Sequence, residues 1–321
     1  MRLALGHIKE LRHVEDLTDE TLHFIKQLGV DVVHLSRPLL FNEKHYRFMD
    51  LLHLRTRCED AGLILEAIEG VPIGSYDKVM LGLPGRDEEI DQLATTIENM
   101  GRAGISIFSY HWMPNFVWRT SRTTLGRGGA KCMSFDMELA KNAPLSHNRI
   151  YTEEAMWANY EYFVRAIVPV AEQAGVKLAL HPDDPPVESL GGIARIFRNF
   201  EGLKRAMEVI ESPVHGLNLC LGCLSEMGTG VIESIRYFGE RDKIFYIHFR
   251  DVQGAVPGFQ ECFINEGNTD LFEVVRTLRE VGFTGSLLPD HVPQMAGDTP
   301  WGHRGRAYAI GYMTALLAAA S

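Results

Sequence analysis

Four side chains that could bind a metal ion stand at the ends of short apolar runs in the second half of the chain. They are His181, Cys220, His248 and Asp290. Imidazole, thiolate and carboxylate groups together suit Mn²⁺, Fe²⁺ or Zn²⁺ better than Ca²⁺ or Mg²⁺. Taken singly, each has an ordinary explanation, and Cys220 could simply be a small buried hydrophobic residue. Their shared position at the ends of apolar runs is what indicates a divalent-metal site.

The residues that follow His181 explain why a strand must end there. Residues 176–180 are Val-Lys-Leu-Ala-Leu, and His181 is followed by Pro-Asp-Asp-Pro-Pro. Proline has no N–H to donate to a sheet ladder and fixes its own φ, so the strand ends at the histidine. Asp183 and Asp184 either orient the imidazole or cap the next helix.

Short apolar runs alternate along the whole chain with segments whose apolar residues recur every three or four positions, as in amphipathic helices. The predicted strands are Leu3–Gly6, Val30–Leu35, Leu63–Ile68, Ile105–Tyr110, Val176–Leu180, Gly216–Leu221, Ile244–Phe249 and Gly285–Leu288. Glycines that close helices precede several of them, as in Ala61-Gly62 and Ala174-Gly175. Eight βα repeats predict one domain over residues 1–321, a parallel (β/α)₈ (TIM) barrel. Strand carboxyl ends meet at one mouth of such a barrel, so the four candidate ligands should meet there too.

One long segment interrupts the alternation. Residues 114–150, after the fourth predicted strand, are rich in Arg and Gly and have no clear helical period. Insertions of this length in compact domains are usually functional or disordered. We expect an irregular excursion that covers the mouth as a lid or faces a partner, and that brings Arg119 to the substrate. An ordinary solvated loop is the alternative.

Composition limits the classes of function. The chain has 321 residues, 45% of them hydrophobic, and a net charge of −10, which disfavours a general nucleic-acid surface. Its five cysteines are scattered and odd in number, so they suit a reducing compartment better than a disulfide framework. The first residues read as a strand rather than a signal peptide, and no apolar run approaches the ~20 residues that span a membrane. We therefore expect a soluble cytoplasmic enzyme with no membrane or nucleic-acid partner.

The order of the motifs resembles that of the mannonate dehydratases, a family of xylose-isomerase-like barrels. The resemblance rests on His181-Pro-Asp-Asp-Pro-Pro186, the strand that ends at Cys220, Ile247-His248-Phe249-Arg250, Pro289-Asp290-His291, Val71-Pro72-Ile73, Met113-Pro114, Trp118-Arg119-Thr120 and Tyr308-Ala309-Ile310-Gly311. The chain departs from the family pattern beside Pro289-Asp290-His291. Leu288 stands where the family has arginine, and Val292-Pro293 stand where it has Gly-His.

The resemblance implies a cofactor, a reaction and a catalytic pair. The four candidate ligands would bind Mn²⁺ (manganese) or Fe²⁺ (iron), and the enzyme would convert D-mannonate to 2-dehydro-3-deoxy-D-gluconate and water in hexuronate degradation. His291 and Tyr308 would be the catalytic acid and base, with either assignment open. We expect a homo-oligomer that binds a small sugar acid.

The same reaction requires groups that bind an anion in an acidic protein. Arg119, Arg250 and Arg306 are candidates, although each could be an ordinary surface residue. His111 could contact substrate or cap its strand, and Glu69 could bind substrate hydroxyls or form a structural ion pair.

Two other functions are compatible with the barrel. One is a divalent-metal sugar isomerase or epimerase, although such enzymes typically use paired Glu and Asp ligands where this chain has Cys220. The other is a metal-binding barrel without turnover, against which His291 and Tyr308 argue.

Overall fold

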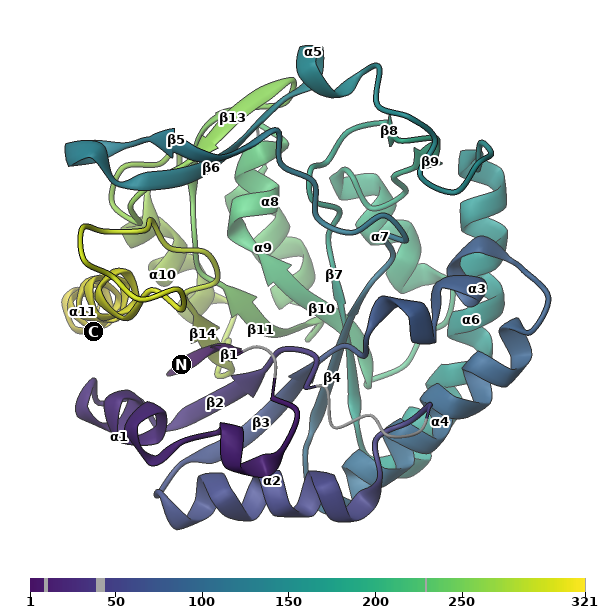
Figure 1. The fold of residues 1–321 in the computed structure, drawn as a ribbon, viewed down its shortest axis with the longest axis horizontal. Coiled ribbons are helices and arrows are strands. Elements are labelled where there is room, and N and C mark those ends of the chain that lie inside the picture. The colour runs from purple at the N-terminus through teal and green to yellow at the C-terminus, as the bar shows by residue number, and fades with distance from the viewer. Residues whose placement is uncertain (9–10, 39–43, 229, 321) are drawn as a thin grey trace.

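Eight parallel strands close into a barrel in the computed structural model, which describes residues 1–8, 11–38, 44–228 and 230–320 (Figure 1). Their order around the barrel is β1-β14-β11-β10-β7-β4-β3-β2. The bounds are β1 (Arg2–Ile8), β2 (Val32–Leu35), β3 (Ile64–Glu69), β4 (Ile107–His111), β7 (Lys177–His181), β10 (His215–Cys220), β11 (Ile244–His248) and β14 (Ser286–Leu288). Each predicted strand overlaps one of these, so the predicted (β/α)₈ barrel is confirmed.

Helices surround the barrel and join its strands. They are α1 (Asp19–Gln27), α2 (Phe48–Asp60), α3 (Asp77–Leu81), α4 (Arg86–Ala103), α5 (Met137–Ala140), α6 (Glu153–Ala174), α7 (Phe200–Glu208), α8 (Leu221–Glu226), α9 (Val231–Gly239), α10 (Leu271–Glu280) and α11 (His303–Ala319). Single 3₁₀ turns lie at η1 (Val14–Asp16), η2 (Ile73–Ser75) and η3 (Arg127–Gly129). Gly104 and Gly175 cap α4 and α6 with φ of 74° and 66°, which confirms the predicted helix-to-strand turns.

The core of the barrel itself has two parts because each strand alternates its side chains between two faces. The larger part packs the outer faces of the strands against the helices. The smaller part consists of Ala4, Val32, Ala67, Ile107, Ala179, Phe245, Tyr246 and Leu288, contributed by strands all round the barrel. Filling the barrel interior keeps its strand ends at fixed positions, which lets them hold a site.

The segment after β4 contains regular structure, and the expectation of an irregular excursion is wrong in this respect. It forms the hairpin β5 (Ser121–Leu125) and β6 (Lys131–Asp136). The hairpin pairs with β13 (Gly258–Glu261) and β12 (Val252–Ala255), which follow β11, in a four-stranded sheet of order β12-β13-β6-β5 (Figure 1). The two-stranded sheet β8 (Ser189–Leu190) and β9 (Ile193–Ala194) lies nearby. Half of the larger sheet comes from over 100 residues later in the chain, so no local pattern in residues 114–150 reveals it.

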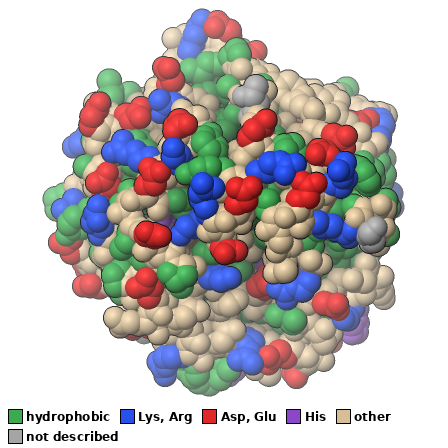
Figure 2. Space-filling model, turned by 180° about the vertical axis from the view of Figure 1, so that it is seen from behind, with side chains coloured by type: hydrophobic (Ala, Val, Ile, Leu, Met, Phe, Trp, Pro, Cys, Tyr) green, Lys and Arg blue, Asp and Glu red, His purple; other side chains and the backbone are tan. Residues whose placement is uncertain are grey.

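The outer surface is charged but mixed in sign. Acidic and basic side chains are interspersed over the face seen in Figure 2. A field of mixed sign attracts a polyanion weakly. Within the described residues, no helix combines the length and apolar character that a bilayer span requires.

Candidate active site

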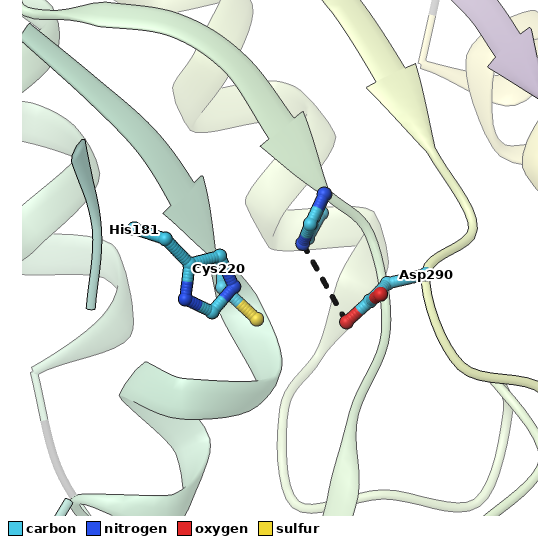
Figure 3. Close-up of side chains that lie close together, drawn as sticks. His181, Cys220 and Asp290 are labelled. Carbon is cyan, nitrogen blue, oxygen red and sulfur yellow. Dashed lines mark ion pairs between the residues drawn. The ribbon is translucent and has the colours of Figure 1, made fainter. Parts of the chain in front are cut away.

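The four candidate ligands converge at the carboxyl ends of consecutive barrel strands. His181 ends β7, Cys220 ends β10, His248 ends β11 and Asp290 follows β14. One ligand atom from each lies within 4.8 Å of the others. Figure 3 shows His181, Cys220 and Asp290 directed toward one space. His248 Nδ1 forms an ion pair with Asp290 Oδ2 at 3.5 Å.

Both histidines of this cluster have one ring nitrogen free for a metal ion. His181 Nδ1 lies 2.6 Å from the carbonyl oxygen of Pro182, to which it donates, so Nε2 keeps its lone pair. His248 Nε2 lies 2.9 Å from Glu69 Oε1, and Nδ1 is buried without a hydrogen-bond partner among the described residues. A carboxylate or carbonyl that accepts from the far nitrogen is the usual support of a metal-binding histidine.

The Cys220 sulfur is surrounded by groups that favour the thiolate. Burial opposes ionisation, but a hydrogen bond from Cys223, the charge of Arg250 and the two imidazoles outweigh it and hold the pKa of Cys220 well below its usual value. Cys220 is fully buried as the residue before α8. A thiolate is the form of cysteine that binds metals.

Asp290 is held as a carboxylate by the cations and imidazoles around it. Burial would raise its pKa, but the imidazoles of His291, His248 and His7 hold it well below the usual range. Arg250 Nε donates to Asp290 Oδ2 at 2.9 Å. Two imidazole nitrogens, a thiolate and a carboxylate therefore form a donor set that fits a divalent transition-metal ion.

A cavity of about 390 Å³ opens over the cluster, and His181, His248 and Asp290 line it. This volume lies within the range of small-molecule pockets. His291 lines the same cavity and is half-buried. Its Nδ1 lies 2.8 Å from Glu261 Oε1, and its Nε2 lies 3.6 Å from Asp290 Oδ1. The imidazole therefore stands beside the candidate metal ligands, oriented by a carboxylate from β13.

This chain is similar in sequence and in fold to proteins of one enzyme family. A sequence model of the D-mannonate dehydratase family (UxuA) matches residues 13–149 and 142–321. The mannonate dehydratase of Streptococcus pneumoniae (strain 70585) is 33% identical over 302 residues, covering 84% of this chain and 82% of that protein. The crystal structure of mannonate dehydratase from Streptococcus suis serotype 2 superposes with a TM-score of 0.89 at 30% identity, covering 100% of this chain and 93% of that one.

The chain belongs to the D-mannonate dehydratase family. It is therefore a carbon–oxygen lyase of the hydro-lyase class, as its relatives are. More distant barrels, such as an L-ribulose 3-epimerase (TM-score 0.65, 16% identity), share the fold.

Tyr308 does not reach the cavity, although the family resemblance implied that it is the second catalytic group. Its hydroxyl donates to Asn265 Oδ1 at 2.8 Å, its ring packs against Phe263, and it is 37% exposed. Arg306, two residues earlier on α11, does line the cavity. Residues two apart on a helix face different directions, so the two side chains cannot share the pocket. The geometry gives no support to a catalytic hydroxyl at Tyr308.

Arg119 and Arg250 differ from the expectation of free substrate-binding cations. Arg119 contacts Asp184, Glu261 (2.8 Å) and Glu226 (3.5 Å), and its side chain is 1% exposed. Arg250 donates to Asp184 (2.9 Å), Glu226 (2.8 Å) and Asp290. Only Arg119 of the two lines the cavity. Both charges are neutralised within the protein, and Arg250 positions a candidate metal ligand instead.

The remaining predicted residues, Arg306, Glu69 and His111, line the cavity. Arg306 donates to the carbonyl oxygens of Pro289 (2.9 Å) and Asp290 (3.3 Å), and burial lowers its pKa to about 10. Glu69 supports His248, as described. His111 accepts from the Met113 N–H (3.3 Å), and burial holds its pKa well below the usual value, so it is neutral.

Sequence reasoning missed several residues of this cavity, among them His7, Arg37, Asn218 and Glu261. His7 Nε2 lies 2.6 Å from Asp290 Oδ1, and Asn218 Nδ2 lies 3.2 Å from His248 Nε2. A signal existed for His7 and Arg37, because both stand at or after the ends of predicted strands. Glu261 belongs to the β12–β13 hairpin, which the sequence pattern does not indicate.

Proposed function

We propose that this chain dehydrates D-mannonate to 2-dehydro-3-deoxy-D-gluconate, with Mn²⁺ or Fe²⁺ bound by His181, Cys220, His248 and Asp290. The observation that carries the proposal is the convergence of these four donors beneath a cavity that also holds His291. Family membership supports the reaction, since the relatives are mannonate dehydratases.

The reaction breaks the C2–H and C3–O bonds of the sugar acid. The C2 proton leaves as a proton, the C3 hydroxyl leaves as water, and the resulting enol becomes the 2-keto group. A divalent ion, when bound, would supply Lewis acidity to an oxygen of the substrate and so ease the loss of the C2 proton. The protein's own residues must move the protons.

His291 is the proton-transferring group in this proposal. Its Nδ1 is hydrogen-bonded to Glu261, so its Nε2 remains for proton exchange with substrate beside Asp290. Proton transfer by a positioned side chain typically contributes ~10²–10⁴-fold to a rate. The burial of the cluster also excludes water, which strengthens the electrostatic contacts inside.

The test is incubation of the metal-loaded protein with a panel of aldonic acids and aldoses, measuring 2-keto-3-deoxy acids. D-Mannonate should give the product, and His291→Asn should lower its formation by ~10² or more with metal content unchanged. His23→Asn, at an exposed histidine of α1, is the matched control and should retain activity. No 2-keto-3-deoxy product from any aldonic acid, or epimerised aldoses instead, would refute the proposed reaction.

A further inference from the structure

Arg37 is a half-buried arginine of the cavity whose donors have no hydrogen-bond partner among the described residues. It lines the cavity, follows β2 and is half-buried. It forms no ion pair and no side-chain hydrogen bond with any described residue. The other buried arginines of the cavity differ, because Arg119 is held by three carboxylates and Arg306 by backbone carbonyls.

The surroundings of Arg37 hold the guanidinium without neutralising it. Its guanidinium carbon lies 4.2 Å from the centroid of the Phe116 ring, a cation–π contact that restrains the group. Its side-chain carbons lie against Gly70, where an added Cβ would be 3.5 Å from Arg37 Cγ. An aromatic face restrains an arginine but accepts none of its N–H donors.

The backbone on both sides of this contact adopts conformations that side chains rarely take. Arg37 has φ of +46° and Phe116 has φ of +62°. Non-glycine residues in the left-handed region are strained, and such residues concentrate at ligand-binding sites. The two strained residues are also the two partners of the cation–π contact.

Arg37 lies on the side of the mouth opposite the candidate metal ligands. The ligands come from β7, β10, β11 and β14, which are consecutive in the barrel. Arg37 follows β2 and Phe116 follows β4, in the other half of the barrel. A ligand in the cavity therefore lies between the metal-binding cluster and a planar cation with free donors.

We propose that Arg37 binds the carboxylate of the substrate and so selects sugar acids over neutral sugars. This inference rests on the proposed function for the identity of the substrate. Guanidinium and carboxylate groups match in geometry and can form two parallel hydrogen bonds. The protein carries a net charge of −10, so an anionic substrate requires a local unneutralised cation of this kind.

The test measures binding without turnover. Metal-loaded His291→Asn protein is titrated calorimetrically with D-mannonate and with the uncharged D-mannonamide, with Arg37 intact or changed to Gln or Lys. Arg37→Gln should weaken D-mannonate binding by ~10–100-fold, as loss of a charged hydrogen bond does, and mannonamide binding much less. Arg37→Lys should recover only part of the loss, because an ammonium group lacks the planar pair of donors.

The control is Arg149→Gln, which removes an arginine stacked 4.3 Å from the Tyr151 ring outside the cavity. Metal content of each variant checks that the barrel is folded. Equal loss for acid and amide, or unchanged D-mannonate binding in Arg37→Gln, would overturn the inference. If the Arg37-intact protein instead binds other aldonates and not D-mannonate, the proposed substrate fails while the role of Arg37 is still tested with those acids.

Discussion

Cys220 offers the sharpest residue-scale test of the proposed metal site. Serine keeps the size of the side chain but does not ionise near neutral pH, so Cys220→Ser removes a charged ligand. Metal content should fall at least ~10-fold, since loss of even a supporting contact costs ~10–100-fold in affinity. Elemental analysis after dialysis measures it, with Cys132→Ser, a buried cysteine of β6, as the control. Full occupancy in both Cys220→Ser and His248→Ala would contradict the assignment.

Tyr308 can be tested by removal of one oxygen atom. Its hydroxyl donates to Asn265 and its side chain does not line the main cavity, so Tyr308→Phe should keep turnover within a few-fold of the parent. Steady-state kinetics with D-mannonate measures this. A loss of ~10² or more at normal metal content would instead restore the catalytic role expected from the family resemblance, and would require α11 to rearrange when substrate binds.

At the scale of elements, the antiparallel sheet beside the mouth positions the proposed catalytic imidazole. Glu261 ends β13 and accepts from His291 Nδ1. β13 in turn pairs with β6, so the hairpin after β4 supports a residue that follows β14. The segment that the sequence predicted as a lid therefore also pairs with the strand that carries this support, and its role as a lid stays a prediction.

Glu261→Gln tests this support without a change in shape. The substitution removes the charge that holds His291 and Arg119, so kcat should fall by about tenfold or more while metal content stays constant. Glu266→Gln, which removes the partner of Arg127 in the following loop, is the matched control. If Glu261→Gln retains full kcat, the sheet does not act through His291.

At the scale of the whole molecule, a buried histidine links the stability of the barrel to pH. His215 Nδ1 donates to the Ile210 carbonyl (3.4 Å), and its Nε2 accepts from the Tyr160 hydroxyl (3.1 Å), which ties β10 to α6. Burial lowers the pKa of His215 to about 4. The unfolded chain therefore binds a proton between pH ~6.5 and ~4 that the folded chain does not.

It follows that this histidine's contribution to stability is complete above pH ~6.5 and decreases as the pH falls toward 4. The free energy of unfolding should drop by up to about 3 kcal/mol from this group across the window. His215→Gln should show a shallower pH dependence in urea unfolding, with His23→Gln as the exposed control. Parallel pH curves for the parent and His215→Gln would contradict this prediction.

The sequence by itself determined the barrel and the convergence of its four candidate ligands. Alternation of apolar runs and amphipathic helices is a local property, and parallel barrel strands must bring their carboxyl ends together. His181, Cys220, His248 and Asp290 could therefore be located from their places in the pattern, and so could the cavity residues Glu69 and His111.

Only the tertiary structure decided which charges remain available at the site. Nothing in the local sequence distinguishes Arg37 from Arg119 and Arg250. In the folded chain, carboxylates from other segments neutralise Arg119 and Arg250, whereas Arg37 faces the cavity without a carboxylate partner among the described residues. The same holds for Tyr308 and Glu261, whose positions depend on the rotation of α11 and on the pairing of β13 with β6. Ion pairs between residues 24 to 142 positions apart, and strand pairing across more than 100 residues, follow from no local pattern, so only the folded chain reveals them.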